Sequence, residues 1–422
     1  MSITTQGYIV KFMFANGQTL DISRNILSDD EATNYVTGFS VEEYLYTPNQ
    51  NPIGVITSNT FKLNLKSKDR SLLPNNNNSI YYGYMNNTAM IMLGVQYLNS
   101  EGIQKSINFG LFYISNWTSS GTSDDKYSVV IEGVDLLGIL IKNKIPANEI
   151  KRNIAIADYM SGIQNSVNTG LNNKYKFLFN WKDNPKYDTI STSDIEADDL
   201  NMLFNIIDQS LLYNMYIDRD VNTINRVINI VDATKSLGVS VASVSDDVDI
   251  TYAALDNGPL VNYTGVKVNY SLYNPNAPSN IANLSGITLI PGDNIIENID
   301  LGGNIFKILY VGIDTEDINL VKINSVTYNR KSCTLSIKNT STSNITVDIN
   351  INGQTMLENK LSVEKSGNTD SKEMLEVTNS IIPSNSVNAY ATDLLNLIKR
   401  KSDTLLIRGN FDPEIFRLNN TI

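Results

Sequence analysis

The chain has 422 residues, of which 41% are hydrophobic and 9% aromatic, a composition that suits about two to four folded domains and excludes an intrinsically disordered protein. It contains no histidine and one cysteine, which excludes Ser-His-Asp and Cys-His catalysis, a histidine general base and an intrachain disulfide. The net charge of -11 disfavours sequence-independent nucleic-acid binding, for which cationic patches supply the affinity.

The N-terminal segment, residues 1–40, carries one β-rich run at 8–14, followed by Asn16-Gly17, a pair typical of a hairpin turn. The N-terminus lacks the basic stretch followed by an apolar segment that marks a standard export signal. No apolar run in the chain approaches the ~20 residues that would span a bilayer. We therefore expect synthesis in the cytosol without a standard export signal and no membrane insertion.

Residues 41–145 are expected to form a compact β unit. In the run 61–66, the apolar Phe61, Leu63 and Leu65 alternate with polar residues, which is typical of a strand with one buried face. Further strands are predicted at 89–98, 109–115 and 127–132, and a short helix at 135–141.

Residues 146–245 change to a mixed α/β pattern. A helix is predicted at about 194–212, with Ser193 and Glu196 spaced as a capping box at its start. Its apolar stripe consists of Leu200, Leu203, Phe204, Ile207 and Leu211. A second helix at 156–169 and a hairpin formed by 213–218 and 223–230 complete this small α/β unit.

Residues 246–422 return to short strands. The clearest is 345–351, where β-branched residues alternate with polar ones, and others are predicted at 261–270, 305–312 and 321–328. An amphipathic helix follows Pro383-Ser384, and 405–408 is the last expected strand. Within this second β unit, the strands at about 330–365 are expected to form a β insertion.

Several residues resemble parts of chemical sites without completing one. The acidic clusters are Asp124-Asp125, Asp194/Glu196/Asp198/Asp199 and Asp246-Asp247/Asp249. We interpret them as helix caps and solvated turns, because no second signal indicates a catalytic carboxylate pair. Asp218 opens a run like a calcium loop, but Thr223 and Asn229 occupy the positions where an EF-hand needs Gly and Glu.

The aromatic and sulfur candidates also favour a structural interpretation. Trp117 and Trp181 could stack on sugars, but core or interface positions are favoured for both. Cys333 lies in a strand-like run and is interpreted as a small buried hydrophobe. The sequence therefore predicts no catalytic, cofactor-binding or metal-binding residues and no cofactor.

The order of signals in 55–145 resembles tail and baseplate proteins of phages and phage-like particles of Gram-positive bacteria. The resemblance rests on the strand at 61–65, the Tyr-Tyr-Gly-Tyr-Met run at 81–85, the strand at 90–97, the Gly-Leu-Phe-Tyr-Ile-Ser-Asn-Trp segment at 110–117 and Val-Asp-Leu-Leu at 134–137. A second match lies near the C-terminus, in 379–384, the following helix and Ile-Arg-Gly-Asn at 407–410. In the tail proteins this C-terminal segment usually runs Arg-Gly-Asn-Pro, whereas this chain has Arg408-Gly-Asn-Phe.

The resemblance implies a mainly β fold, with two tail-tube-like β-barrels at 41–145 and 246–422 joined by the small α/β domain at 146–245. It implies a non-enzymatic viral structural protein, a baseplate or tail-tip hub of a phage or contractile injection system that connects the tail tube to the central spike. The expected partners are further copies of the chain as a trimer, the tail tube or distal tail protein, the spike and other baseplate proteins. The expected location is the virion tail tip or baseplate, after assembly in the bacterial host cytoplasm.

Two alternatives to the hub remain open. One is a peripheral tail adaptor or receptor-binding baseplate protein with glycan-binding loops. The other, less favoured, is a tail-associated glycan hydrolase, which would need two carboxyl groups facing each other across a cleft.

Overall fold

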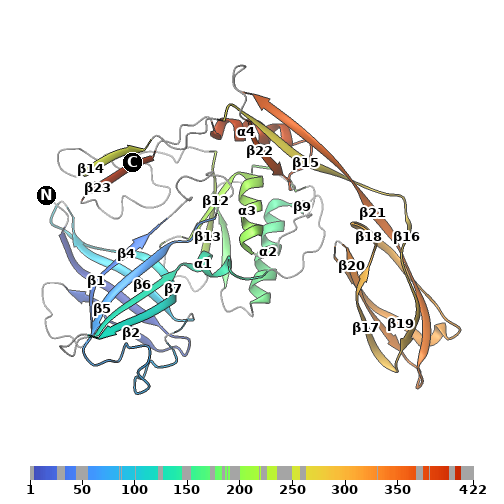
Figure 1. Cartoon of the computed structure of the whole chain (residues 1–422), viewed down its shortest axis with the longest axis horizontal. Helices are drawn as coiled ribbons and strands as arrows, with labels where there is room; N and C mark the ends of the chain where they lie inside the picture. The colour runs from blue at the N-terminus through green and yellow to red at the C-terminus, as the bar shows by residue number, and fades with distance from the viewer. Residues whose placement is uncertain are drawn as a thin grey trace.

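The computed structural model describes residues 4–25, 34–43, 56–84, 86, 88–99, 101–121, 127–144, 154–171, 176–182, 186–187, 189–190, 200–217, 219, 226–234, 250–256, 263–329, 331–366, 374–379, 381–398 and 404–409. Strands make up 58% and helices 16% of the structure, so the expected mainly β class is confirmed. A central α/β unit lies between an N-terminal sheet and a distal pair of sheets (Figure 1).

The N-terminal sheet has eight antiparallel strands in the spatial order β2-β1-β6-β7-β8-β5-β4, with β3 paired beside β1. Its strands are β1 Thr4–Met13, β2 Thr19–Asp21, β3 Arg24–Asn25, β4 Asn34–Glu42, β5 Thr60–Ser67, β6 Met90–Leu98, β7 Gln104–Gly121 and β8 Tyr127–Val134. Because β1 pairs with β6 along its whole length, the sheet extends across residue 40, where the sequence suggested a division. No ladder among the described residues joins β2 to β4, so closure of the expected first barrel is not found.

The alternation of apolar and polar residues in β5 buries one face of the strand, as predicted. Leu63 and Leu65 are fully buried in the core of this sheet, and Lys62 points to solvent. The sheet also requires close backbone approach near its end, since a side chain at Gly133 would collide with the carbonyl oxygen of Tyr113.

The central unit packs helices against a small mixed sheet. Its sheet has the order β10-β13-β12, with β10 parallel and β12 antiparallel to β13. Its elements are α1 Leu136–Leu140, β9 Ile154–Ala155, α2 Ile156–Gly170, β10 Phe177–Trp181, β11 Thr189–Ile190, α3 Leu200–Leu211, β12 Tyr213–Ile217 and β13 Arg226–Asp232. The helix predicted at 156–169 and the hairpin after residue 212 are therefore confirmed.

The described part of α3 begins at Leu200, and the expected cap at Ser193 and Glu196 lies outside the described residues. The helix ends in an unusual way. Leu212 adopts a left-handed conformation with φ 55°, a position where glycine is usual. Leu212 is fully buried and its carbonyl accepts the Ala233 N–H at 2.8 Å, so packing holds the strained turn in place.

Within the described residues the C-terminal strands lie in three separate sheets, and closure of the expected second barrel is not found. They divide into a β14-β23 pair, a sheet of order β16-β21-β15-β22 with β18 also on β21, and a sheet of order β17-β20-β19. The elements are β14 Ile250–Asp256, β15 Gly265–Pro275, β16 Ser279–Leu289, β17 Gly292–Asp300, β18 Ile305–Asp314, the 3-10 helix η1 Ile318–Leu320, β19 Val321–Tyr328, β20 Ser332–Asn339, β21 Ile345–Ser366, β22 Met374–Asn379, α4 Val387–Ile398 and β23 Thr404–Gly409.

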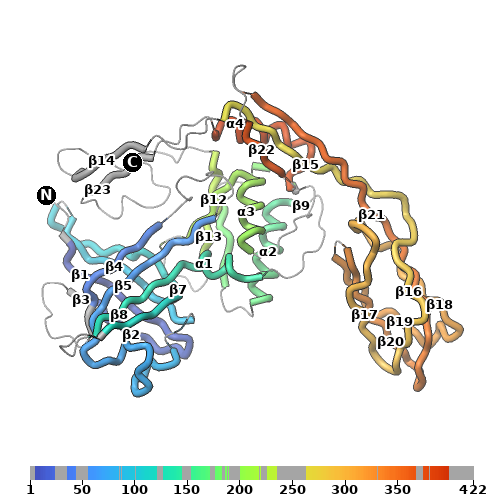
Figure 2. Tube along the Cα trace, in the orientation of Figure 1, coloured from blue at the N-terminus to red at the C-terminus, as the bar shows by residue number. Residues whose placement is uncertain are grey.

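The cause of this division is β21, which is 22 residues long. Its first half pairs with β16 and β18 in a distal β-sandwich, and its second half pairs with β15 beside α4. β15 and β21 therefore form a long ribbon between the central unit and the sandwich, with β22 paired beside β15 over Gly265–Tyr270 (Figure 2). The β insertion expected at 330–365 covers β20 and nearly all of β21. The buried core of the distal sandwich has other bounds, since it begins at Leu289 and reaches Ile351.

Three hydrophobic cores underlie the architecture. One fills the N-terminal sheet and another the distal sandwich. The largest joins the central unit to β15, β22 and α4, so residues more than 200 positions apart share one core. The central unit and the C-terminal helix therefore fold as one body.

The α3 face gives a direct test of this core. Phe204 is fully buried and its ring meets Phe179 edge to face, with centroids 6.1 Å apart. We expect Phe204→Ala to lower the free energy of unfolding by about 3–5 kcal/mol, through lost burial and a residual cavity. Chemical denaturation measures this, with Met202→Ala on the exposed side of the same helix as control. A loss below about 1 kcal/mol for Phe204→Ala would contradict the assignment.

Candidate functional site

The acidic clusters singled out in the sequence, at 124–125, 194–199 and 246–249, lie outside the described residues, as does Asp218. Among the residues that are described, no group of three or more His, Cys, Asp or Glu side chains could hold a metal ion. In the same part of the chain, no helix combines the length and the apolar character needed to cross a bilayer.

Both tryptophans pack against hydrophobic cores, as the sequence favoured. The Trp117 indole N–H donates to the Leu72 carbonyl at 2.9 Å, and its ring lies 6.1 Å from that of Phe12. Trp181 meets Tyr213 edge to face at 5.3 Å. Cys333 is buried in the sandwich core, which raises the pKa of its thiol to about 11 and makes it unreactive.

The most distinctive polar feature is an ion pair that joins the N-terminal sheet to the central unit. Arg219 donates from Nε to Glu43 Oε1 at 2.7 Å and from a terminal nitrogen to Glu43 Oε2 at 2.6 Å. The two side chains are only 8% and 13% exposed. A bidentate, shielded pair of this kind fixes both distance and orientation.

A β-bulge brings an aromatic ring to the same point. The register of β7 against β6 shifts at Phe109, and Gly110 takes φ 121°. The Phe109 ring consequently lies 5.1 Å from the Arg219 guanidinium, in cation–π geometry. Gly110 opens the Gly-Leu-Phe-Tyr segment on which the resemblance to tail proteins partly rests, so that segment contributes to the joint.

Asp135, from the Val-Asp-Leu-Leu motif, is the N-cap of α1. Its carboxylate accepts the Asn59 N–H at 3.0 Å and the Gly138 N–H at 3.1 Å. Burial raises the pKa of Asp135 to about 7, helped by nearby Glu43 and opposed by the backbone donors. The motif is therefore structural: it fastens the start of β5 to the helix that leads into the central unit.

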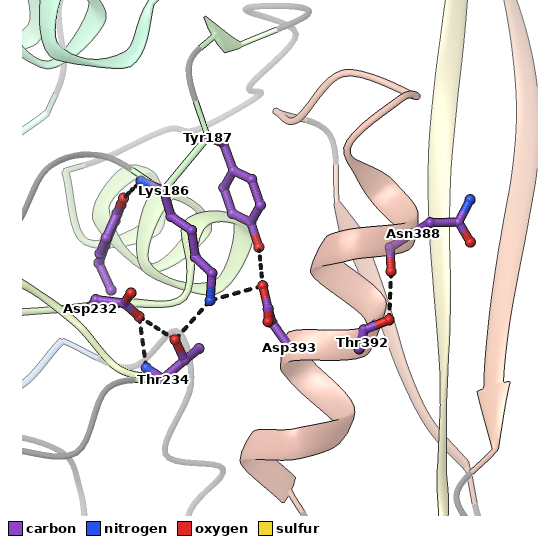
Figure 3. A network of polar contacts seen from close by, with 8 residues as sticks. Lys186, Tyr187, Asp232, Thr234, Asn388, Thr392 and Asp393 are labelled. Carbon is purple, nitrogen blue, oxygen red and sulfur yellow. Dashed lines mark hydrogen bonds and ion pairs between the residues drawn. The ribbon is translucent and has the colours of Figure 1, made fainter.

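A second polar joint fastens α4 to the central unit (Figure 3). Lys186 Nζ lies 2.8 Å from Asp393 Oδ2 and donates to Thr234 Oγ1 at 2.8 Å. Tyr187 Oη donates to the same Asp393 oxygen at 3.4 Å, and Thr234 Oγ1 donates to Asp232 at 2.6 Å. Burial, with Asp393 close by, raises the pKa of Tyr187, so this hydroxyl stays protonated.

Hydrogen bonds to the end of α3 reinforce this second joint. Tyr390 Oη donates to the Gln209 carbonyl at 2.8 Å, and the Asn379 amide donates to the Ser210 carbonyl at 2.9 Å. The C-terminal carbonyls of a helix need such partners. The carbonyl groups at the end of α3 thus receive their hydrogen bonds from β22 and α4, which follow α3 by more than 160 residues.

Sequence reasoning singled out none of Arg219, Glu43, Lys186 or Asp393. Each pair is separated by more than 170 residues, and no local pattern marks it. The two pairs thus fix Glu43, next to the N-terminal sheet, and α4 to the central unit.

No family model matches the chain, and no curated protein matches it in sequence. A tail protein from Neisseria meningitidis MC58 has a similar structure, with 11% identity and a TM-score of 0.36 over 63% of this chain and 63% of that one. The 43 kDa tail protein of prophage MuSo2 from Shewanella oneidensis has 13% identity and a TM-score of 0.35 over 62% and 63%. A Francisella PdpA-VgrG complex in its lidded form has 12% identity and a TM-score of 0.35 over 83% of this chain and 52% of that one.

The match to each tail protein thus spans less than two thirds of that protein's length. These structural neighbours are thus two tail proteins, one of them from a prophage, and a PdpA-VgrG complex, all at distant similarity.

The first joint can be tested by breaking it. We expect Arg219→Ala to destabilise the fold by about 3–5 kcal/mol, because it leaves the Glu43 carboxylate buried without its partner. Chemical denaturation gives the free energy, and hydrogen exchange should show the loss of protection concentrated in 34–42 and 104–121. Lys62→Ala, which breaks the exposed Lys62–Glu132 pair, is the matched control and should change little. Equal effects of the two variants would contradict a fixed joint.

A buried carboxyl in α3 predicts a pH dependence. Asp208 is 1% exposed, accepts the Met215 N–H and leaves Oδ1 without a hydrogen-bond partner among the described residues. Burial raises the pKa of Asp208 well above its ordinary value. The folded chain therefore holds a proton that the unfolded chain releases above about pH 4, and stability falls as the pH rises from there.

We expect Asp208→Asn to reduce this dependence, since the neutral amide keeps the shape and has no proton to lose, while Asp135, whose pKa is also raised, supplies the part that remains. Unfolding midpoints between pH 4 and pH 8 measure it, with the exposed Asp158→Asn as control. An unchanged slope in Asp208→Asn would show that Asp208 does not control it.

Proposed function

We propose that the chain is a structural hub of the baseplate or tail tip of a phage or phage-tail-like particle, connecting the tail tube to the central spike. It has no catalytic role in this proposal, and its activity is assembly. The main support is the pair of joints at Arg219–Glu43 and Lys186–Asp393. They attach the β units on either side to one central body with defined geometry.

A connector between two assemblies must keep its parts in a fixed relation while force passes through it. Flexible linkers between units would not do this, whereas desolvated ion pairs and a shared core would. Here the N-terminal sheet is attached by a bidentate pair that is at most 13% exposed. The C-terminal ribbon and α4 share the central core itself.

The motifs that resemble tail proteins support the same proposal through their positions. The 110–117 segment begins at the bulge that supplies Phe109 to the first joint, and Asp135 caps the helix that leaves the sheet. The positive-φ residue Gly110 and the helix cap Asp135 thus lie where the sheet meets the central unit. This fits a protein selected for the geometry of that connection.

Assembly would follow from the exposed strand edges, which must be covered to prevent uncontrolled pairing. We propose a ring of three copies, in which the two β units of each subunit supply six segments around a channel. The partners would be further copies of the chain, the tail tube or distal tail protein, the spike and other baseplate proteins.

The decisive measurement is the copy number and position of the chain inside the purified particle, by electron cryomicroscopy. We expect three copies, with both β units in the ring and subunit contacts well above ~1,000 Å². Six copies, or a peripheral position, would contradict the hub and favour the adaptor alternative. Release of peptidoglycan fragments by the purified chain would instead favour the hydrolase.

A further inference from the structure

The outer face of the distal sheet formed by β16, β21 and β18 is unusually rich in amides. The inner face of β21 is buried, with Val347, Ile349 and Ile351 in the sandwich core. The outer rows are set by the strand registers, which place Asn280 and Tyr310 on either side of Asn352. In the next row, Asn283 and Gly312 lie on either side of Asn350, and Asp314 lies opposite Asp348 beyond it.

Asparagine and aspartate are disfavoured in strands, so their concentration along a central strand calls for a function or a specific contact. Asp348 has such a contact, because its carboxylate accepts the Gly286 N–H at 2.7 Å. Asn350 and Asn352 are half-buried, yet within the described residues their side-chain amides form no hydrogen bond with the rest of the chain. Their donors and acceptors are free to bind an external group.

An exposed aromatic ring lies beside these amides. Tyr310 is 61% exposed, although its ring belongs to a sheet face. A Cβ built at Gly312 would lie 3.8 Å from Tyr310 Cε2 and 3.9 Å from Asn350 Cβ. Gly312 therefore leaves an open place, with room for at least a Cβ, between the Tyr310 ring and the backbone and Cβ of Asn350.

We propose that this surface, the amide face (Asn283, Tyr310, Gly312, Asp348, Asn350 and Asn352), binds a neutral oligosaccharide. A sugar presents hydroxyl groups that donate and accept, and an amide offers both functions on one planar group. It also presents an apolar C–H face, which packs on an aromatic ring. The amide face brings these two kinds of contact together within two adjacent rows of one sheet.

The charge and polarity of the amide face favour a neutral sugar over other classes of ligand. The outer rows carry one basic side chain, Lys307, against two acidic ones, Asp314 and Asp348, which disfavours nucleic acid and anionic polysaccharide. A protein partner would be expected to cover an apolar centre with aromatic anchors, whereas amides occupy the centre here. The inference does not depend on the hub proposal, since it rests on the residues of the amide face alone.

The test uses the full chain and four neutral probes, namely maltotetraose, cellotetraose, mannotetraose and N-acetylchitotetraose. Binding is measured by isothermal titration calorimetry at up to millimolar sugar, with a hyaluronan tetrasaccharide as the anionic comparison. We expect at least one neutral probe to bind and the anionic one not to bind. If no neutral probe binds, or the anionic one binds more tightly, the proposal is overturned.

Variants then place any binding on the amide face. We expect Tyr310→Ala and Asn350→Ala each to weaken it about tenfold, through the lost ring contact and the lost hydrogen bonds. Gly312→Val is the sharpest variant, because its new Cβ meets only ordinary contacts at 3.8 Å and yet fills the open place. It should abolish binding while the thermal midpoint stays unchanged.

Tyr82→Ala is the matched control, because Tyr82 is 49% exposed but lies in the N-terminal unit. It should bind as the parent chain does. Retention of full affinity in both Gly312→Val and Tyr310→Ala would show that the sugar binds elsewhere and would overturn the assignment. Loss of affinity in Tyr82→Ala alone would do the same.

Discussion

The arrangement of the molecule depends on a shielded ion pair between residues far apart in sequence. Arg219 and Glu43 make two short contacts, and the ring of Phe109 in β7 covers the guanidinium. Removing two charges from water is costly, and a bidentate geometry with a ring above it is needed to offset that cost. Such a pair specifies one orientation better than it adds stability, and orientation is what a connector needs.

The second constraint is the shared core. α4 begins more than 150 residues after β13, the last strand of the central unit, yet its side chains and those of the ribbon complete the interior of that unit. Tyr390 and Asn379 also satisfy carbonyls at the end of α3. A helix end buried without partners would be unstable, so the central unit cannot be complete until the C-terminal helix has docked. The N-terminal sheet has its own core and does not share this dependence.

Local periodicity explains what the sequence could predict. The strand at Phe61–Leu65, the helix at 156–169 and the alternating strand at 345–351 each carry a repeating apolar pattern, and all are found. The helix predicted at about 194–212 is found over its described part, Leu200–Leu211. The joints were missed because an isolated arginine or glutamate carries no periodic signal. The division of the C-terminal strands was missed because nothing local shows that β21 changes partners midway, and Leu212 stands where a glycine would have marked the end of the helix.

The ribbon explains how the sandwich can be added without disturbing the rest. β15 and the second half of β21 pair along all 11 residues of β15, so the chain leaves the central unit and returns to it in adjacent strands. A two-stranded ribbon is marginal alone, but here β22 pairs with β15 at the base, Val266 and Val268 fix that base in the central core, and the sandwich fixes the far end. At about 3.3 Å per residue, it holds the sandwich roughly 35 Å from that base. A ligand on the amide face would therefore be bound well away from both joints, and the face could change its specificity without altering the geometry of the connection.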